Sequence, residues 1–127
     1  MAEPAEKRDY EAAMDTFRKG DFVAAQAALS AFVQRYRKGG YAPSALFWLG
    51  NAQYANKDYK ESMVNFQQML KSSPTHPRAP EAMLAVSNIQ IELKDLKAAR
   101  KTMEELVKTY PASETAATAR DRLARLR

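Results

Sequence analysis

The sequence predicts an all-α solenoid of three helical hairpins and one terminal helix, on the basis of two observations. One turn pattern recurs every 37 residues along the 127-residue chain, as Gly20-Asp21-Phe22, Lys57-Asp58-Tyr59 and Lys94-Asp95-Leu96. After each aspartate, apolar residues recur at spacings of three and four, which is the pattern of one helix face. A period of about 20–50 residues is typical of stacked repeats, whose units bury their apolar faces against neighbouring units. Such proteins usually bind other molecules rather than transform them.

The first hairpin shows the signals that define each helix. Its first helix is predicted from about Glu6 to Lys19 and should end at Gly20, because glycine adopts a positive φ at little cost. Asp21 is expected to cap the second helix by accepting from its free backbone N–H groups. Asp58 and Asp95 are expected to cap the fourth and sixth helices in the same way.

The links between hairpins contain helix-breaking residues. Residues 37–43, 73–80 and 110–115 form these links, with prolines at 74, 77, 80 and 111 and the pair Gly39-Gly40. Proline lacks an N–H and clashes with the preceding turn, so it should stop a helix. Ser113 should cap a final amphipathic helix that covers the end of the stack. We therefore expect one domain, residues 1–127, with repeats at about 6–37, 43–73 and 80–110 and a capping helix at about 113–126.

The second helix of each hairpin should provide most of the core. Its predicted apolar stripes are Phe22, Ala25, Leu29, Phe32, Val33 and Tyr36, then Tyr59, Ser62, Phe66, Met69 and Leu70, then Leu96, Ala99, Met103, Leu106, Val107 and Tyr110. Gly50 lies in the middle of a first helix, where glycine costs about 1 kcal/mol relative to alanine. Because the equivalent residues Ala13 and Ser87 are also small, we expect a close neighbour at this level of every repeat.

These residues resemble the tetratricopeptide repeat. The resemblance is carried by Leu46, Leu49-Gly50, Asp58-Tyr59, Phe66 and Pro74. The sequence departs from that pattern at Arg37, Gln53, Ser62, Ser87 and Gln90, and its period is 37 residues rather than 34. Over roughly residues 9–126 the chain is also similar to the C-terminal domain of the CpoB/YbgF family, through residues 41–50, Asp58-Tyr59-Lys60, Tyr110-Pro111-Ala112-Ser113, Ala117, Ala119 and Arg122-Leu123.

The resemblance implies a fold, a location and a partner. The fold would be a right-handed superhelix, and the domain would be a periplasmic part of the Tol–Pal system of the cell envelope. It would bind TolA and help to coordinate outer-membrane constriction with septal peptidoglycan synthesis, so the peptidoglycan synthase machinery is a second expected partner. Members of that family carry a signal peptide and a trimerising N-terminal coiled coil, neither of which is visible in this sequence. We therefore expect this fragment to be monomeric and the full-length protein to be trimeric.

In that repeat family the first helix of each hairpin lines the concave surface. Shifting the sequence by 37 residues gives three rows on this side, which predict an apolar groove with two asparagines that could bind the backbone of a partner segment. Aromatic residues at helical spacing can instead be core, and Trp48 is predicted to be interior or at the groove margin. Truncating Tyr54 or Phe47 to alanine is expected to weaken binding while the domain stays folded. The predicted groove residues are Tyr10, Phe47 and Leu84, then Met14, Asn51 and Asn88, then Phe17, Tyr54 and Ile91.

Composition argues against several other functions. The chain has no cysteine, and its single histidine, His76, is predicted to be an exposed loop residue without partners for a metal site or a catalytic triad. No nucleotide-binding or hydrolase motif is present, so we expect neither catalysis nor a cofactor nor a metal. Residues 1–4 are polar and give no sign of a secretory leader.

Two alternatives remain open on the sequence alone. One is another tetratricopeptide scaffold of the bacterial envelope, of the outer-membrane assembly type. The other is a basic module that binds nucleic acid or a membrane surface, because the net charge is +5 and Arg120, Arg122, Arg125 and Arg127 crowd the last eight residues. No aromatic residue lies among these arginines to stack on a base.

Overall fold

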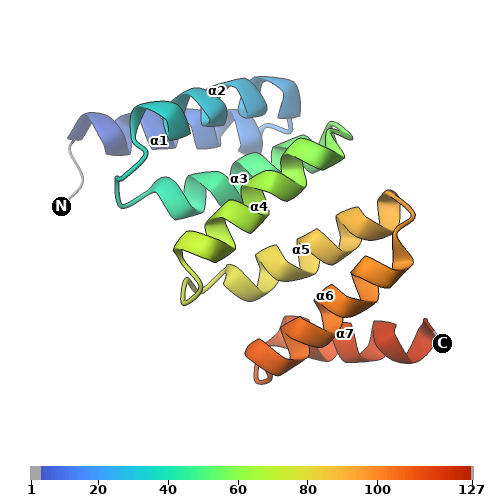
Figure 1. Ribbon diagram of the computed structural model, residues 1–127. Coiled ribbons are helices and arrows are strands. Elements are labelled where there is room, and N and C mark those ends of the chain that lie inside the picture. The colour runs from blue at the N-terminus through green and yellow to red at the C-terminus, as the bar shows by residue number, and fades with distance from the viewer. Residues whose placement is uncertain (1–3, 127) are drawn as a thin grey trace.

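Seven helices follow one another along the chain and stack into a curved solenoid (Figure 1). The computed structural model describes residues 4–126, so Met1–Glu3 and Arg127 lie outside the described part. Within that part no strand is present, which confirms the predicted all-α class. The helices are α1 (Pro4–Arg18), α2 (Phe22–Arg35), α3 (Ala42–Ala55), α4 (Tyr59–Ser72), α5 (Ala79–Glu92), α6 (Leu96–Thr109) and α7 (Glu114–Arg125).

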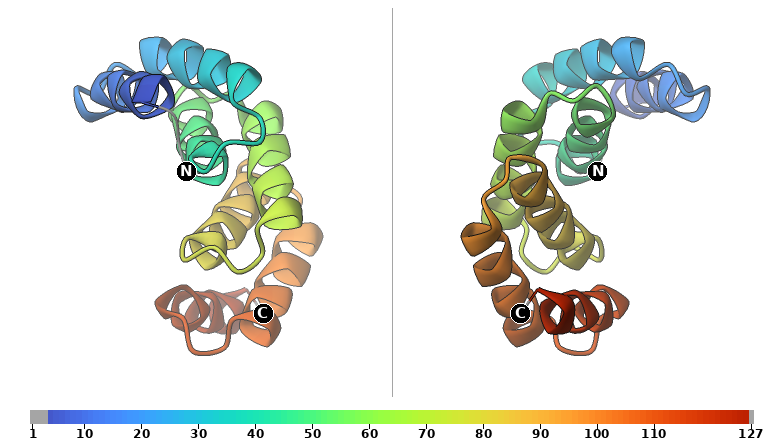
Figure 2. Two further views of the ribbon diagram at one scale, coloured as in Figure 1. Left: turned by 90° about the vertical axis from the view of Figure 1, so that its left-hand side faces the viewer. Right: turned by 90° about the vertical axis from the view of Figure 1, so that its right-hand side faces the viewer.

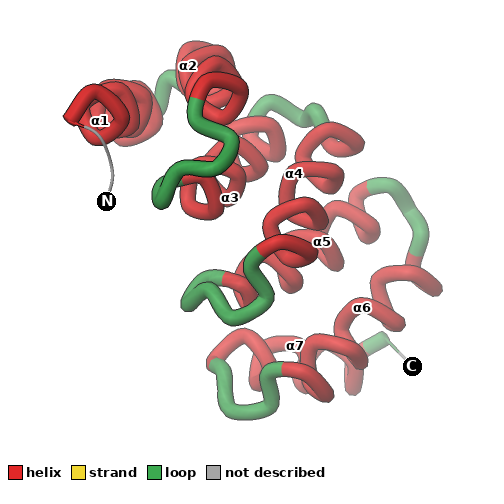
Figure 3. The backbone as a smooth tube through the Cα atoms, turned by 60° about the vertical axis from the view of Figure 1, so that its left-hand side comes forward, coloured by secondary structure: helices red, strands yellow, loops and turns green. Residues whose placement is uncertain are grey.

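The helices form two layers. Each packs on the next in sequence, and α7 also packs on α5. With the helices seen roughly end-on, α1, α3, α5 and α7 lie on the inner side of the arc, and α2, α4 and α6 lie on the outer side (Figure 2). Short loops join the helices throughout (Figure 3). The first helices of the hairpins therefore line the concave surface, and the second helices form the convex surface.

The hairpin turns share one backbone conformation. Gly20 has a φ of 78°, and Lys57 and Lys94 at the equivalent positions each have a φ of 63°. Glycine adopts this left-handed conformation freely, whereas it strains a lysine backbone. The repeated turn is thus kept even where the residue that favours it is absent.

Two of the three predicted aspartate caps form. The carboxylate oxygens of Asp21 and Asp95 accept from the backbone N–H of Ala24 and Ala98, each at 3.1 Å. The prediction for Asp58 is wrong, because no side-chain cap bond forms there. Its carboxylate instead accepts from Nε2 of Gln26 at 3.1 Å, so a side chain of the preceding repeat takes the oxygen.

Two of the link prolines lie at helix starts. Pro43 and Pro80, at which the second and third repeats were expected to begin, lie in the first turns of α3 and α5. Proline is tolerated there because the first N–H groups of a helix have no intrahelical acceptor. These two residues therefore end the links and start the next helices.

The core lies between the two layers as three hydrophobic clusters along the stack and follows the predicted apolar stripes of the second helices. Ala25, Ser62 and Ala99 are fully buried, and so are Leu29, Phe66 and Met103. The close approach predicted at Gly50 is confirmed, since a Cβ atom added there would lie 2.8 Å from the Phe66 ring. The Oγ of Ser62 donates to the carbonyl oxygen of Gly50 at 2.6 Å. Gly50 is therefore required by the packing of α4 against α3.

Candidate functional site

The nine predicted groove residues lie on α1, α3 and α5, the helices of the concave side (Figure 2). Three of them are almost fully buried: Tyr10, Met14 and Phe47 expose 9%, 5% and 4% of their surface. The other six are partly exposed. They are Phe17, Asn51, Tyr54, Leu84, Asn88 and Ile91.

The buried members of the set are held by aromatic packing. The Tyr10 ring stacks on Tyr41 with centroids 4.6 Å apart and meets Phe32 edge-on at 5.6 Å. The Phe47 ring meets Phe66 edge-on at 5.7 Å. Replacing a buried phenylalanine by alanine costs about 3–5 kcal/mol of stability. The expectation that Phe47→Ala leaves the fold intact is therefore corrected, and Tyr54 is the better position for testing the groove.

The exposed members gather at the carboxyl end of α3, where a polar cluster joins three helices. The Glu92 carboxylate of α5 and the Arg122 guanidinium of α7 both act electrostatically on the Tyr54 hydroxyl of α3. Arg122 Nη1 also donates to Oδ1 of Asn88. Burial raises the pKa of Tyr54, and the negative charge of Glu92 raises it further. Tyr54 is thus held as a neutral hydrogen-bonding group.

The two asparagines of the predicted groove, Asn51 and Asn88, have different partners. Asn51 Nδ2 donates to the carbonyl oxygen of Phe47 in its own helix at 2.9 Å. Its Oδ1 takes part in no hydrogen bond with the rest of the described chain, and so can accept from a ligand. The Oδ1 of Asn88 is already occupied by Arg122. Asn51 therefore offers a free acceptor to a ligand, whereas the amide oxygen of Asn88 is bound to an arginine.

Nearer the start of α3 the concave side is aromatic and carries a cation. Trp48 meets the Phe17 ring edge-on at 5.1 Å and the Phe47 ring at 4.9 Å. The Arg78 guanidinium lies over Trp48 at 4.9 Å and over Phe47 at 5.4 Å, with Nη1 3.0 Å from Oε2 of Glu81. A cation held over aromatic faces can meet an acidic or aromatic group of a ligand.

His76 differs from its prediction as an exposed loop residue. It is half-buried, with Nε2 3.3 Å from the Ser44 hydroxyl and Nδ1 accepting from the Arg78 backbone N–H at 3.0 Å. The ring therefore braces the link before α5. Among residues 4–126, no cluster of histidine, aspartate and glutamate side chains has the arrangement of a metal site.

Sequence reasoning missed three contributors to this surface: Arg78, Glu92 and Arg122. Glu92 directly follows Ile91 of the predicted rows, so its position was a usable signal. Arg122 reaches Asn88 across 34 residues of sequence, which periodicity within one helix cannot reveal. None of the helices in the described chain has the length and apolar composition needed to cross a bilayer.

Comparison with known structures identifies the fold. PcrH from Pseudomonas aeruginosa is similar with a TM-score of 0.82 and 15% identity, over 99% of this chain and 94% of PcrH. PcrH in complex with the chaperone binding region of PopD gives a TM-score of 0.83 and 15% identity, over 99% and 93% of the two chains. The second tetratricopeptide domain of human RPAP3, solved with an HSP70 peptide, gives 0.74 and 14%, over 91% and 92%. At these identities the likeness establishes a tetratricopeptide-type solenoid.

Comparison of sequences identifies the family. The cell division coordinator CpoB of Pseudomonas putida is 40% identical over 53 residues, which are 42% of this chain and 20% of CpoB. The match thus spans about a fifth of that relative's length. The model of a family described as outer membrane lipoprotein, YfiO, matches residues 2–127. The chain belongs to the YfiO outer membrane lipoprotein family.

Proposed function

We propose that this domain is a non-catalytic protein-binding module of the bacterial envelope, which holds a helical or extended segment of a partner in its concave groove. The observation that carries the proposal is the arrangement around Tyr54. Partly exposed aromatic and aliphatic side chains on this side accompany a free amide oxygen on Asn51 and two charged residues, Glu92 and Arg122, that act on the Tyr54 hydroxyl. Apolar walls with a few fixed polar groups suit recognition of a peptide backbone.

The structural relatives support this mode of binding. PcrH has been solved with the chaperone binding region of PopD and RPAP3 with an HSP70 peptide, so solenoids of this shape accept segments of other proteins. We extend that property to the present chain. Its affinity would come mainly from a few anchors, of which Tyr54 is the first candidate.

The proposed partner is TolA, with the peptidoglycan synthase machinery as a further contact. The support is the local similarity to a cell division coordinator, CpoB, together with the resemblance of the residues 41–50 and 110–113 to that family. The domain would then lie in the periplasm and help to coordinate outer-membrane constriction with septal peptidoglycan synthesis.

A second candidate is a scaffold of the outer-membrane assembly type. It is favoured by the family match, which spans residues 2–127, whereas the similarity to CpoB spans 53 residues. The same groove would then hold a segment of a different envelope protein. The two candidates differ in partner rather than in the mode of binding.

The deciding experiment is an NMR titration of the labelled domain with the periplasmic helical region of TolA at two salt concentrations. We expect shifts at Asn51, Tyr54 and Asn88 that persist at high salt, because apolar contacts are not screened. Shifts confined to Arg120 and Arg125 and abolished by salt would overturn the groove proposal. The absence of shifts would overturn TolA as the partner and favour the second candidate.

Variants sharpen the same measurement. Tyr54→Ala should weaken binding by about 1 kcal/mol or more, roughly fivefold, as expected for an interface anchor. Tyr54→Phe keeps the ring and loses the hydroxyl, so it separates packing from hydrogen bonding. Val64→Ala is the control, because Val64 is 54% exposed on α4, a helix of the convex side. Normal binding by both Tyr54 variants would contradict the proposal.

A further inference from the structure

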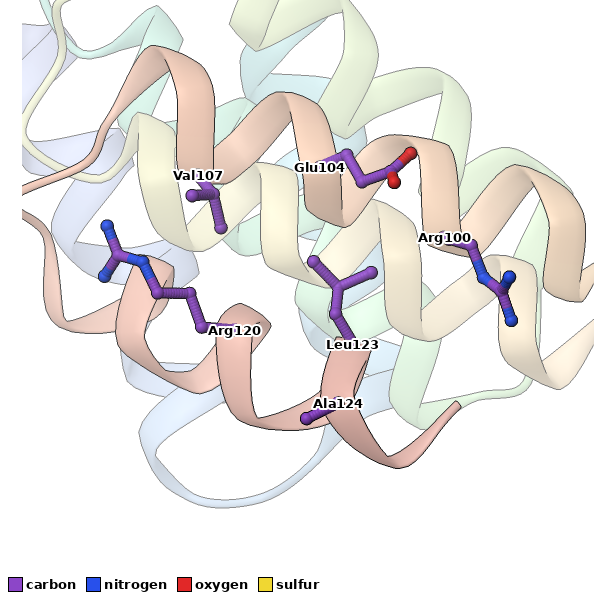
Figure 4. A pocket seen from close by; sticks show the side chains of 6 residues that line it. All are labelled: Arg100, Glu104, Val107, Arg120, Leu123 and Ala124. Carbon is purple, nitrogen blue, oxygen red and sulfur yellow. The ribbon is translucent and has the colours of Figure 1, made fainter. Parts of the chain in front are cut away.

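A cleft of about 450 Å³ lies between α6 and α7 at the end of the solenoid. Val107 and Leu123 point into it, and Arg100 and Arg120 lie at its opposite ends (Figure 4). No residue of the concave rows lines it. The lining residues are Arg100, Glu104, Val107, Arg120, Leu123 and Ala124.

Helix α7 continues the 37-residue register of α3 and α5. Ala116 follows Ala42 and Ala79, and Ala119 follows Ala45 and Ala82. All six alanines are buried. Thus α7 occupies the place of a fourth first helix, and it packs on α5 and α6 as α5 packs on α4.

Two other clefts in the solenoid have equivalent lining residues, shifted by 37 or 74 positions. One lies between α2 and α3 and is closed on one side by α4, and the other lies between α4 and α5 and is closed by α6. No helix of residues 4–126 takes that place beside α7. The corresponding lining residues, 37 apart, are Val33, Leu46, Asn65 and Gln68 in one copy and Leu70, Met83, Thr102 and Glu105 in the next.

Within residues 4–126, a position of α7 that is buried in the other repeats lies on the surface. Ala124 is exposed, whereas its equivalents Gly50 and Ser87 are buried. Leu123 is half-buried, whereas its equivalents Leu49 and Val86 are almost fully buried. A Cβ atom on Gly50 would collide with the Phe66 ring of α4. Ala124 carries a Cβ atom, as its equivalent Ser87 does, so the surface there matches the third repeat, in which Met103 of α6 takes the place of Phe66.

We propose that this face, which we call the α6–α7 end face, binds an amphipathic helix of a partner protein in the position that α6 takes on α5. The repeats show the apolar face that such a helix needs: a small residue followed by large apolar residues four and seven positions later. Ser62, Phe66 and Met69 of α4 have this spacing, and so do Ala99, Met103 and Leu106 of α6. All six residues are fully buried.

The charges of the face indicate an acidic partner helix. Arg100 and Arg120 donate to the backbone carbonyl oxygens of Leu126 and Pro111, and neither pairs with a carboxylate within the described chain. Glu104 is the one acidic residue of the lining. In the cleft between α4, α5 and α6, Glu105 of α6 and Met83 of α5 both line the wall. Arg120 is the equivalent of Met83. An acidic residue at the Glu105 position of a partner helix would therefore meet Arg120.

The test uses a synthetic peptide of residues 58–73 with the substitutions Phe66→Met, which introduces the side chain found at the equivalent position 103, and Gln68→Glu. It is titrated into the labelled domain and followed by NMR. This peptide carries the α4 face and places a carboxylate near Arg120. We expect shifts at Val107, Leu123 and Ala124. Ala124→Glu should lower the affinity at least about tenfold. Ala117→Glu is the matched control: Ala117 is an exposed alanine on the same helix but does not line the cleft, so this variant should bind as the parent does.

Each other outcome overturns the proposal. A peptide with Phe66→Ser in place of Phe66→Met should fail to bind, and equal binding by it would show that the apolar face is not recognised. Shifts on the concave rows, no shifts at millimolar peptide, or unchanged affinity of the Ala124→Glu domain would each do the same. If the end-face resonances shift with the concentration of the domain alone, a second copy covers the face. The proposal does not depend on the concave groove, and the two surfaces give separate sets of shifts.

Discussion

The two ends of the solenoid are built on the same 37-residue frame but from different side chains. From Tyr10 to Phe66 the packing is aromatic, with ring pairs that connect α1, α2, α3 and α4. The last cluster contains Ala99, Met103, Leu106 and Ala119, with aliphatic side chains around it and Tyr110 as its one aromatic neighbour. The 37-residue repeat therefore sets where the helices contact one another, while the size of the side chains in the core differs from repeat to repeat.

The difference has a consequence for function. Aromatic rings bury large areas and fix their neighbours in place, so the first two hairpins form a firm platform for Trp48 and Tyr54. The third hairpin and α7 present a thinner core and long arginine side chains. We expect the first region to hold its shape on binding and the second to adjust more readily.

The largest expected change in stability comes from replacing the equivalent core residues Phe66 and Met103 by alanine. Both are fully buried. Phe66→Ala should lower the free energy of unfolding by about 4 kcal/mol, because it leaves a cavity between α3 and α4. Met103→Ala should cost about 2–3 kcal/mol, since the thinner core around it can collapse into the space. Urea denaturation of the two variants measures both values, and equal losses would contradict the comparison.

A smaller effect is expected at the level of Gly50. Gly50→Ala places a methyl group against the Phe66 ring and should cost about 1–3 kcal/mol by overpacking. Ser87→Ala at the equivalent position should change stability little, because its hydroxyl donates to the carbonyl oxygen of Leu84 in its own helix. The same denaturation experiment tests the pair. A neutral Gly50→Ala would show that α3 and α4 are not in close contact.

The smallest expected effect concerns alkaline pH. Burial raises the pKa of Tyr10, Tyr54 and Tyr110 in the folded state, with Glu92 adding to the effect at Tyr54. An unfolded tyrosine has a pKa of about 10, so this contribution is complete below pH 10 and is lost as the pH rises through the folded pKa. Tyr54→Phe cannot ionise and should lose less stability between pH 9 and pH 11. Thermal denaturation across this range tests the prediction, with pH 7 as the reference at which the variant and parent should differ little.

Much of the fold could be predicted because it depends on local signals. The recurring turn, the aspartates and the rows through Leu29 and Phe66 each act within one hairpin. The burial of Tyr10 and Phe47 was harder to foresee, because a first helix packs on two neighbours and its period does not tell which side remains open. The contact of Asp58 with Gln26 was missed for a related reason, since it depends on a side chain of another repeat.

The candidate site was predictable in place but not in detail. The spacing put Asn51, Tyr54 and Asn88 on one side, and all three are partly exposed there. Arg122 joins them because a long side chain on α7 reaches across to α5. Such contacts depend on how the helices stack in space, which a single sequence does not specify.

The packing of each helix on its neighbours in sequence also affects how the chain folds. Each hairpin can form before the rest of the chain is in place, so little loop-closure entropy is lost. Proteins with such local contacts fold within about microseconds to milliseconds. Folding should begin in the aromatic hairpins and spread towards α7. In native-state hydrogen exchange, the amides of α7 should then exchange first and those of α3 and α4 last.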